Sequence, residues 1–292
     1  MKLFYFSGTG NTKAVCGMLA EALEKDHDCP TECISIESDA LQESLSGIAG
    51  DELVGIGYPI YGFGCPSNML SFVRELKDHL HPGQKVFLLQ TAADFIRVNH
   101  WAGADVAKIL NNAGIEVMYE RIIVMGPNFF VAYDDRFNKQ LYRAAMGKTA
   151  HMAGELMNHV HRRPQKGLLG RGLTSLAHYG ESHPGTAIFG RTLKALDTCD
   201  RCGVCVKNCP AGNPVMTGSG VRFTGKCFMC MRCVYACHKK CITSSAMGFV
   251  ILKEGYDLMK AVKDPSVTAD FINDDTKGFY KHFNAYLNDS SL

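Results

Sequence analysis

The sequence has no apolar run long enough to cross a bilayer and no large excess of charge of either sign. Its 292 residues carry a net charge of +2, with 46% hydrophobic and 21% charged residues, which is the composition of an ordinary globular protein. The apolar N-terminus is too short for a signal peptide, so we expect a cytoplasmic protein with no membrane span. The length is long for one domain and comfortable for two.

Several nucleotide-binding and hydrolytic signatures are also missing. The chain contains neither G-x-G-x-x-G nor G-x-x-x-x-G-K-[ST], and it has no HExxH site, paired-carboxylate motif or catalytic triad. We therefore expect no direct NAD(P)H site. No aromatic–basic platform or binding motif accompanies the basic residues, so we expect no nucleic-acid partner.

Cysteine is plentiful, and eight of the thirteen cysteines form two copies of one pattern. Each copy reads C-x2-C-x2-C-x3-C, and each cysteine of the second copy lies 28 residues after its counterpart. The positions are Cys199, Cys202, Cys205, Cys209, Cys227, Cys230, Cys233 and Cys237. Four thiolates per cluster is what a [4Fe–4S] cluster requires. Zinc and a disulfide framework are the alternatives, although zinc sites usually use pairs of C-x-x-C, and disulfides need an oxidising compartment.

Residues 197–248 resemble the bacterial two-cluster ferredoxins. The sequence departs from the pattern at His238, which follows Cys237 where Pro210 follows Cys209. In this signature the fourth cysteine of each run binds the other cluster. The implied ligand sets are Cys199, Cys202 and Cys205 with Cys237, and Cys227, Cys230 and Cys233 with Cys209. Cys241 remains, either as a spare thiol packed beside a cluster or as an alternative ligand.

The N-terminus contains a second motif, a glycine- and hydroxyl-rich loop between an expected strand at residues 2–6 and a helical pattern. The loop consists of Ser7, Gly8, Thr9, Gly10, Asn11 and Thr12. Backbone N–H groups at a helix start favour an anion, and the hydroxyls add donors. Because the loop holds no Lys or Arg, a terminal phosphate monoester bound by neutral donors suits FMN. The alternative is a turn that binds nothing.

S-G-T-G-N-T after a first strand resembles the phosphate loop of the flavodoxins, over residues 1–160. The domain order is similar to that of flavodoxin–ferredoxin fusion proteins from anaerobic bacteria and archaea. Further strand patterns at 31–36, 52–57, 85–90 and 116–124 alternate with helical patterns at about 66–80, 101–112 and 134–160. We expect an α/β fold: a flavodoxin-like doubly wound five-stranded parallel sheet, then a small α+β two-cluster ferredoxin-like domain. The resemblance implies strand order 2-1-3-4-5, with FMN between the first and third strands.

Two later strand ends are expected to hold the flavin ring. One loop contains Pro59, Ile60, Tyr61, Gly62, Phe63 and Gly64, and the other contains Thr91, Ala92, Ala93, Asp94 and Phe95. Glycines let the backbone approach the ring, and aromatics cover its faces. Tyr61 and Phe63 are also explained as core aromatics. Cys65 is read as a structural thiol rather than a redox thiol, because nothing nearby in sequence marks a low pKa.

The chain divides into four segments in this interpretation: an FMN-binding domain (1–162), a basic linker with Gly and Pro (163–197), the two-cluster domain (198–248) and a helical tail (249–292). From Lys139 to Lys194 there are nine Lys or Arg residues against Glu155 and Glu181. This stretch is either a face for an acidic redox partner or a solvated linker. A dimer is one oligomeric state that the sequence allows.

Three functions compete. We favour an iron–sulfur flavoprotein that transfers electrons between two [4Fe–4S] clusters and FMN, and on to a redox partner such as a ferredoxin or a reductase. The alternative is an FMN-dependent reductase of a small-molecule substrate, fed by ferredoxin-type electrons. Its candidate proton donors are Asp94, Arg97 and His100, although a helix start with surface charge explains them equally well. A structural metal protein with a vestigial flavodoxin domain is least favoured, because both cofactor signatures are complete.

Overall fold

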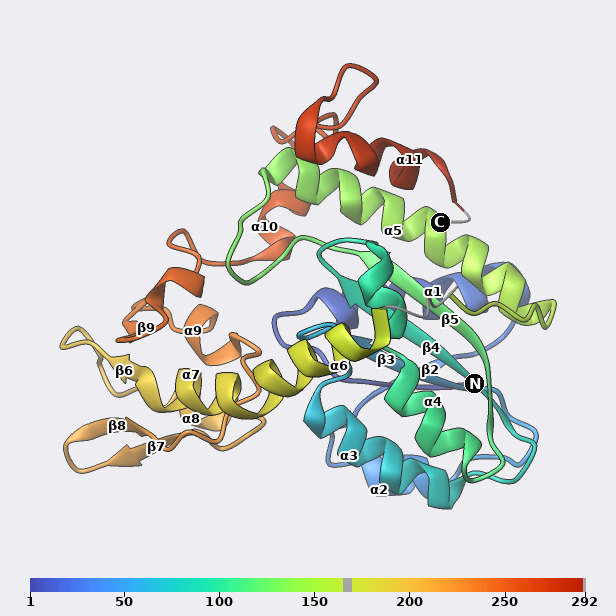
Figure 1. The fold of residues 1–292 in the computed structure, drawn as a ribbon, viewed down its shortest axis with the longest axis horizontal. Helices are drawn as coiled ribbons and strands as arrows, with labels where there is room; N and C mark the ends of the chain where they lie inside the picture. Colours follow the sequence, from blue (N-terminus) through green and yellow to red (C-terminus); the bar gives the residue numbers. More distant parts are fainter. Residues whose placement is uncertain (165–169, 291–292) are drawn as a thin grey trace.

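The computed structural model describes residues 1–164 and 170–290, and its N-terminal part is a parallel sheet between two helical layers (Figure 1). The strands are β1 (Lys2–Tyr5), β2 (Glu32–Ser35), β3 (Val54–Pro59), β4 (Lys85–Ala92) and β5 (Glu116–Val124). They pair in the order β2-β1-β3-β4-β5, and every pair is parallel. The predicted doubly wound sheet and its strand order are confirmed.

Helices cover both faces of this sheet because its central strands are apolar on both sides. On one face lie α1 (Asn11–His27) and α5 (Asp135–Met157), and on the other lie α2 (Leu41–Ser46), α3 (Ser67–Leu76) and α4 (Ala104–Asn111). Alternate residues of β4 serve the two cores: Leu88 packs with the α3 and α4 side, and Phe87 packs with the α1 and α5 side. Short 3-10 turns follow at Lys77–His79 and Arg97–Trp101.

A helical rod leads from the sheet to the cysteine-rich part of the chain (Figure 1). It consists of α6 (Gly170–Gly180), a π-helical turn (Glu181–Gly185) and α7 (Thr186–Thr192). Pro184 lies inside the turn and cannot donate a backbone hydrogen bond, which accounts for the break in regular helix. Much of the predicted linker is therefore helical, and residues 165–169 of it lie outside the described part of the chain.

The cysteine module, residues 193–250, is a separate small lobe (Figure 1). It has two antiparallel pairs, β6 (Leu193–Ala195) with β9 (Ile242–Ser244) and β7 (Pro214–Thr217) with β8 (Gly220–Phe223). Two single-turn helices, α8 (Val204–Lys207) and α9 (Arg232–Tyr235), carry the third cysteine of each run. Its core mixes thiols with apolar residues such as Val234 and Ile242, and Phe189 of α7 packs into it. So small a core is typical of a module that a metal centre stabilises.

The C-terminal segment returns to the sheet domain and packs on α5. After a 3-10 turn at Gly248–Val250 come α10 (Leu258–Lys263), a second 3-10 turn (Gly278–Lys281) and α11 (His282–Asn288). Phe137 of α5 is fully buried with Phe283 and Tyr286 of α11. This aromatic cluster fixes the tail beside the end of β5. No helix within residues 1–164 and 170–290 has the length and apolarity needed to cross a membrane.

Candidate functional site

The loop between β1 and α1 forms a tight, well-anchored turn at the carboxyl edge of the sheet. Gly10 adopts a φ of 106°, a left-handed conformation that favours glycine, and α1 begins at the next residue. Thr12 is buried, and its Oγ1 lies 2.8 Å from Oγ1 of Thr91 at the end of β4. Asn11 Nδ2 donates to the carbonyl of Gly126 at 2.8 Å. The first N–H groups of α1 lack helical acceptors, so this edge presents neutral donors to an anion.

Beside this loop lies an open cleft of about 190 Å³. The predicted residues that line it come from all three expected loops: Ser7, Gly8, Thr9, Asn11, Thr12, Pro59, Ile60, Tyr61, Gly62, Thr91, Ala92 and Ala93. Its lining includes no Lys or Arg among the described residues. The structure thus brings the three loops together around one cavity with neutral donors at one end.

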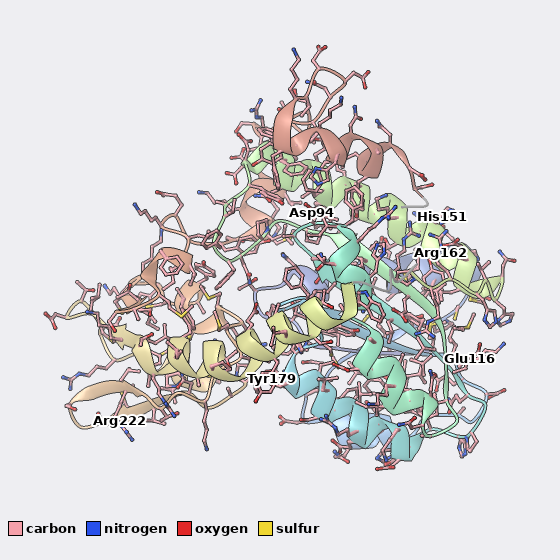
Figure 2. The ribbon with its side chains drawn as sticks, viewed as in Figure 1. Asp94, Glu116, His151, Arg162, Tyr179 and Arg222 are labelled. Carbon is pink, nitrogen blue, oxygen red and sulfur yellow. The ribbon has the colours of Figure 1, made fainter. Side chains whose placement is uncertain are left out.

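Some predicted residues lie outside the cavity lining. Gly10 closes the turn, and Phe63 and Gly64 belong to the far side of the 59–64 loop. Asp94 and Phe95 face the C-terminal tail instead: the Asp94 carboxylate lies 3.0 Å from His282 Nε2, and Phe95 stacks on Tyr286. Figure 2 shows Asp94 on the side of the sheet where the C-terminal helices pack.

The candidate proton donors Asp94, Arg97 and His100 do not line the cavity in the described part of the chain. Arg97 and His100 lie on the 3-10 turn that follows the fourth strand, and Asp94 is engaged by His282. The Cys65 thiol is also outside the cavity. It is fully buried in the core, and burial raises its pKa well above the ordinary value, as expected of a structural thiol.

Seven lining residues were not predicted from the sequence: Met125, Gly126, Pro127, Asn128, Phe129, Glu181 and Met229. The first five follow β5, whose carboxyl end lies at the same edge of the sheet as the other loops. The expected strand order could therefore have predicted that this loop lines the cavity. Asn128 Nδ2 donates to Thr9 Oγ1 at 2.7 Å and ties this loop to the phosphate loop. No local pattern marks Glu181 or Met229, because they reach the cavity through the packing of distant segments.

Gly62 and Gly64 form a tight turn that accommodates the helical rod. Tyr61 and Gly64 exchange two backbone hydrogen bonds, at 2.9 and 3.0 Å, and Gly62 has a φ of 51°. A Cβ on Gly62 would lie 2.6 Å from Oε2 of Glu181, and a Cβ on Gly64 would overlap the ring of His178. These glycines therefore admit α6 and the π-helical turn, and Gly62 also lines the cavity, where the sequence predicted that it admits a flavin ring.

Glu181 is the one acidic side chain in the cavity lining among the described residues. It enters from the π-helical turn and lies against Gly62. Burial raises the pKa of its carboxyl group above the ordinary value, which favours the protonated form. The cavity thus contains a carboxyl group that can hold a proton.

The cysteine module contacts the phosphate loop directly. Arg232, between Cys230 and Cys233, donates to the carbonyls of Ser7 at 2.7 Å and Gly8 at 3.1 Å, and it pairs with Glu37 at 2.7 Å. A Cβ on Gly8 would lie 2.6 Å from the carbonyl oxygen of Cys230. This close approach places the second cysteine run against the wall of the cavity.

Four thiols gather at this contact, and we call Cys209, Cys227, Cys230 and Cys233 the proximal thiol set. Burial raises the pKa of the Cys233 thiol, and Cys230, Cys227, Cys209 and, last, Cys205 raise it further. Cys209 also raises the pKa of the Cys227 and Cys230 thiols, after the larger effect of burial. Two backbone N–H groups donate to these sulfurs at 3.3 Å, Met229 to Cys227 and Asn213 to Cys209. Cys209 thus lies with the second run rather than with its own.

A second cavity in the module is lined by Cys199, Cys202, Cys205 and Cys237, which we call the distal thiol set. Cys241 lines the same cavity, with its Sγ 3.4 Å from that of Cys237. It is 2% exposed and stands as a fifth sulfur beside the set. All thirteen cysteines are free thiols, so neither set is joined by a disulfide.

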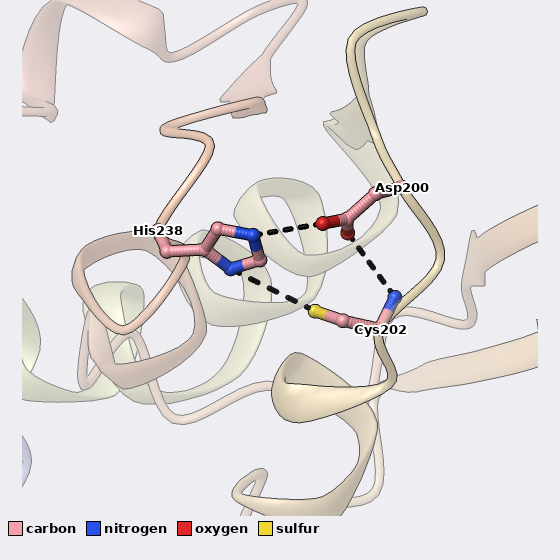
Figure 3. Close-up of side chains that lie close together, drawn as sticks. All are labelled: Asp200, Cys202 and His238. Atoms are coloured by element: carbon pink, nitrogen blue, oxygen red, sulfur yellow. Dashed lines mark hydrogen bonds and ion pairs between the residues drawn. The ribbon is translucent and has the colours of Figure 1, made fainter.

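An exposed trio of Asp200, Cys202 and His238 lies at the surface of the distal set (Figure 3). His238 Nε2 lies 2.7 Å from Asp200 Oδ2, and Nδ1 faces the Cys202 sulfur at 4.0 Å. Three such ligand atoms can hold a divalent cation, as the zinc alternative requires. Cys202 also lines the cavity of five sulfurs, however, and the trio has only this one thiol. We therefore interpret Asp200 and His238 as neighbours of the distal thiol set rather than as part of a separate zinc site.

Comparison with known proteins found similarity to solved structures only. No family model matches the chain, and no curated protein matches it. Among solved structures, a flavodoxin from Streptococcus pneumonia TIGR4 is 20% identical, with 55% of this chain and 98% of that one covered and a TM-score of 0.39. The fold itself, a parallel sheet of order β2-β1-β3-β4-β5 with helices on both faces, is flavodoxin-like.

Two other solved structures are similar to the chain. The two-electron reduced flavodoxin of Megasphaera elsdenii is 21% identical, covering 42% of this chain and 84% of that one with a TM-score of 0.35. A flavodoxin from the domain Archaea is 18% identical, covering 53% and 99% with a TM-score of 0.36. These likenesses concern the fold alone, and function is inferred below from the residues of the chain itself.

Proposed function

We propose that the protein is an iron–sulfur flavoprotein that transfers electrons between two [4Fe–4S] clusters and FMN, and on to a redox partner. One observation supports the proposal: the segment that carries the proximal thiol set packs against the cavity at the phosphate loop. Met229 lines that cavity between Cys227 and Cys230, and the Cys230 backbone touches Gly8. Electron exchange requires that the two cofactors lie close together, and these two candidate sites are in direct contact.

The cavity residues fit FMN. Hydroxyl and backbone donors without Lys or Arg suit a phosphate monoester, and Thr12 is fixed by Thr91 for that role. Ile60, Phe129 and Met229 supply apolar surface for a flat ring. FMN, when bound, would accept and donate one or two electrons. The side chains of the chain would hold its phosphate, orient the ring and exclude water from one side.

The two thiol sets fit two [4Fe–4S] clusters. Each set supplies four sulfurs from two separate stretches of the chain, and the distal set lines a cavity of the module. Backbone N–H groups directed at cysteine sulfurs are typical of cluster sites, where they tune the potential. The clusters, when bound, would carry single electrons.

Glu181 favours a second candidate function, an FMN-dependent reductase of a small molecule. Reduction of an organic substrate needs a proton donor, and Glu181 places in the cavity a carboxyl group whose pKa burial raises. The two functions differ in one measurable respect. A reductase consumes a small acceptor without a second protein, whereas an electron carrier requires one.

Anaerobic reconstitution of the full chain with FMN, iron and sulfide tests the proposal. We expect one FMN and two four-iron clusters per chain, and dithionite should reduce both the clusters and the flavin. Cofactor analysis after acid extraction, iron and sulfide assays and EPR of the reduced protein are the measurements. Zinc without acid-labile sulfide, or FAD in place of FMN, would contradict the proposal.

The grouping of the sulfurs predicts crossed ligation. Cys209→Ser should damage the proximal cluster and leave the distal cluster largely intact, because Cys209 lies with Cys227, Cys230 and Cys233. Serine oxygen is a harder and poorer ligand for iron than thiolate, so the affected cluster should lose iron or shift in potential. Iron counting and EPR of the reduced variant are the measurements.

Cys237→Ser should have the reverse effect, unless Cys241 replaces the lost sulfur at the distal set. In the double variant Cys237→Ser/Cys241→Ala, the Cys241 sulfur is no longer present to replace that of Cys237. Cys33→Ser, at an exposed thiol in β2, is the matched control and should keep both clusters. Loss of the distal cluster in Cys209→Ser, with the proximal one intact, would refute the crossed assignment.

A further inference from the structure

The two thiol sets lie at different distances from the flavodoxin-like domain. The proximal set touches the phosphate loop through Cys230. The cavity of the distal set is lined only by residues 195–242 of the module among those described, and Cys202 on its rim is exposed. The cavity at the phosphate loop is walled in part by Glu181 and Met229, which do not belong to the sheet domain. The exposed Cys202 therefore gives an outside protein a direct approach to the distal set.

A basic groove adjoins the distal set. It runs between β6 and the β7–β8 hairpin and is lined by Arg191, Lys194 and Arg222, with Thr217 and Ser219 adding hydroxyl groups. Ala195 and Val221 line both this groove and the cavity of the distal set, so one layer of side chains separates the two. Figure 2 shows Arg222 at the outer end of the module, far from the sheet domain.

The charges of the groove are uncompensated within the protein. Arg191, Lys194 and Arg222 are exposed, and none has a carboxylate partner in the part of the chain that the structure describes. Residues 191–240 contain nine Lys or Arg residues against two acids, Asp197 and Asp200, whereas the whole chain has a net charge of +2. Basic charge is thus concentrated on the module, where it attracts an acidic surface.

We propose that this groove is the docking site of an acidic one-electron carrier protein of the ferredoxin class, which exchanges electrons with the cluster of the distal thiol set. This inference rests on the proposed function. Each exchange moves one electron: the reduced carrier loses it and the cluster gains it, with no bond or proton transferred. The groove favours a folded acidic protein over nucleic acid, because Phe223 is the one aromatic residue in its described lining and offers no series of stacking surfaces.

The test compares two double charge reversals in the reconstituted full-length protein. Lys194→Glu/Arg222→Glu alters the groove, and Lys25→Glu/Lys108→Glu, at exposed positions on α1 and α4, is the matched control. The probe is an acidic two-cluster ferredoxin, and the readout is its affinity for the oxidised protein by surface plasmon resonance at low and high salt. We expect the groove variant to bind about tenfold or more weakly at low salt, and the control to bind within about twofold of wild type. The difference should shrink as salt rises.

A second readout separates this inference from the proposed function. Reduction by dithionite, a small reagent that needs no docking, should give the same cluster EPR signals in both variants as in wild type. Missing signals in wild type would refute the proposed function. Intact signals with equal ferredoxin affinity in both variants would overturn the docking site alone. Tight binding of an oligonucleotide, lost in the groove variant while ferredoxin binding persists, would also overturn it.

Discussion

Replacing Gly8 by alanine should separate the phosphate loop from the proximal thiol set and weaken FMN binding about tenfold or more. The new Cβ would lie 2.6 Å from the carbonyl oxygen of Cys230 and 2.6 Å from the hydroxyl of Tyr61. The Cys230 contact is backbone, held by Arg232, and it cannot move aside as a flexible side chain would. Overpacking of this kind costs about 1–3 kcal/mol of folding free energy. Fluorescence titration of the flavin-free protein with FMN and thermal unfolding are the measurements.

Gly17→Ala is the matched control for this substitution. Gly17 lies inside α1, and a Cβ there would meet no atom within 4 Å. Alanine is the better helix former, so this variant should gain about 0.5–1 kcal/mol of stability and bind FMN as wild type does. If Gly8→Ala also bound FMN normally, the close contact between the loop and Cys230 would not exist in solution.

Arg232→Met should uncouple the cysteine module from the flavodoxin-like domain while keeping the apolar stem of the side chain. The guanidinium group donates to the carbonyls of Ser7 and Gly8 and pairs with Glu37. Hydrogen bonds from a charged donor contribute about 1.5–3 kcal/mol each, so we expect a loss of about 2–3 kcal/mol after solvent screening of the part-exposed pair. Denaturant unfolding measures this loss. Stopped-flow bleaching of the flavin after cluster reduction should be slowed about tenfold or more.

Glu37→Gln provides the comparison for Arg232→Met. It removes the ion pair and retains both hydrogen bonds to the phosphate loop. Because Glu37 is partly exposed, the cost should be about 0–1 kcal/mol, and the flavin should bleach at the wild-type rate. Equal effects of the two substitutions would mean that the ion pair, and not the contact with the loop, holds the module in place.

Local patterns were sufficient for the sheet and for three of its loops. The buried runs that became β3, β4 and β5 are apolar enough to need cover on both faces, and that requirement alone predicts a doubly wound sheet. The grouping of the cysteines could also be predicted, because their short spacing brings them together through tight turns such as the one at Gly203. Asp94 and Phe95 were misplaced because the sequence gives no sign that His282 and Tyr286 pack against them.

Contacts between distant segments could not be read from the sequence. Glu181 and Met229 reach the cavity only because the helical rod and the module dock on the sheet domain. The same holds for the basic stretch from Lys139 to Lys194. Lys139 and Lys148 look like surface charges, but both are buried and donate to carbonyls of the tail, Asp264 at 2.6 Å and Asp289 at 2.5 Å. At the end of the same stretch, Arg191 and Lys194 are exposed and line the groove beside the distal set.

The bond between Arg232 and Gly8 spans 224 residues of chain, and this bears on how the protein is assembled in the cell. Synthesis proceeds from the N-terminus, and domains fold as they emerge. The flavodoxin-like sheet and its phosphate loop are therefore complete while one wall of their cavity, at Met229, is not yet made. If the proposed function holds, a flavin taken up early would bind an open site, and the module would close that site only after folding around its clusters. The supply of iron and sulfide would then affect how firmly the flavin is retained.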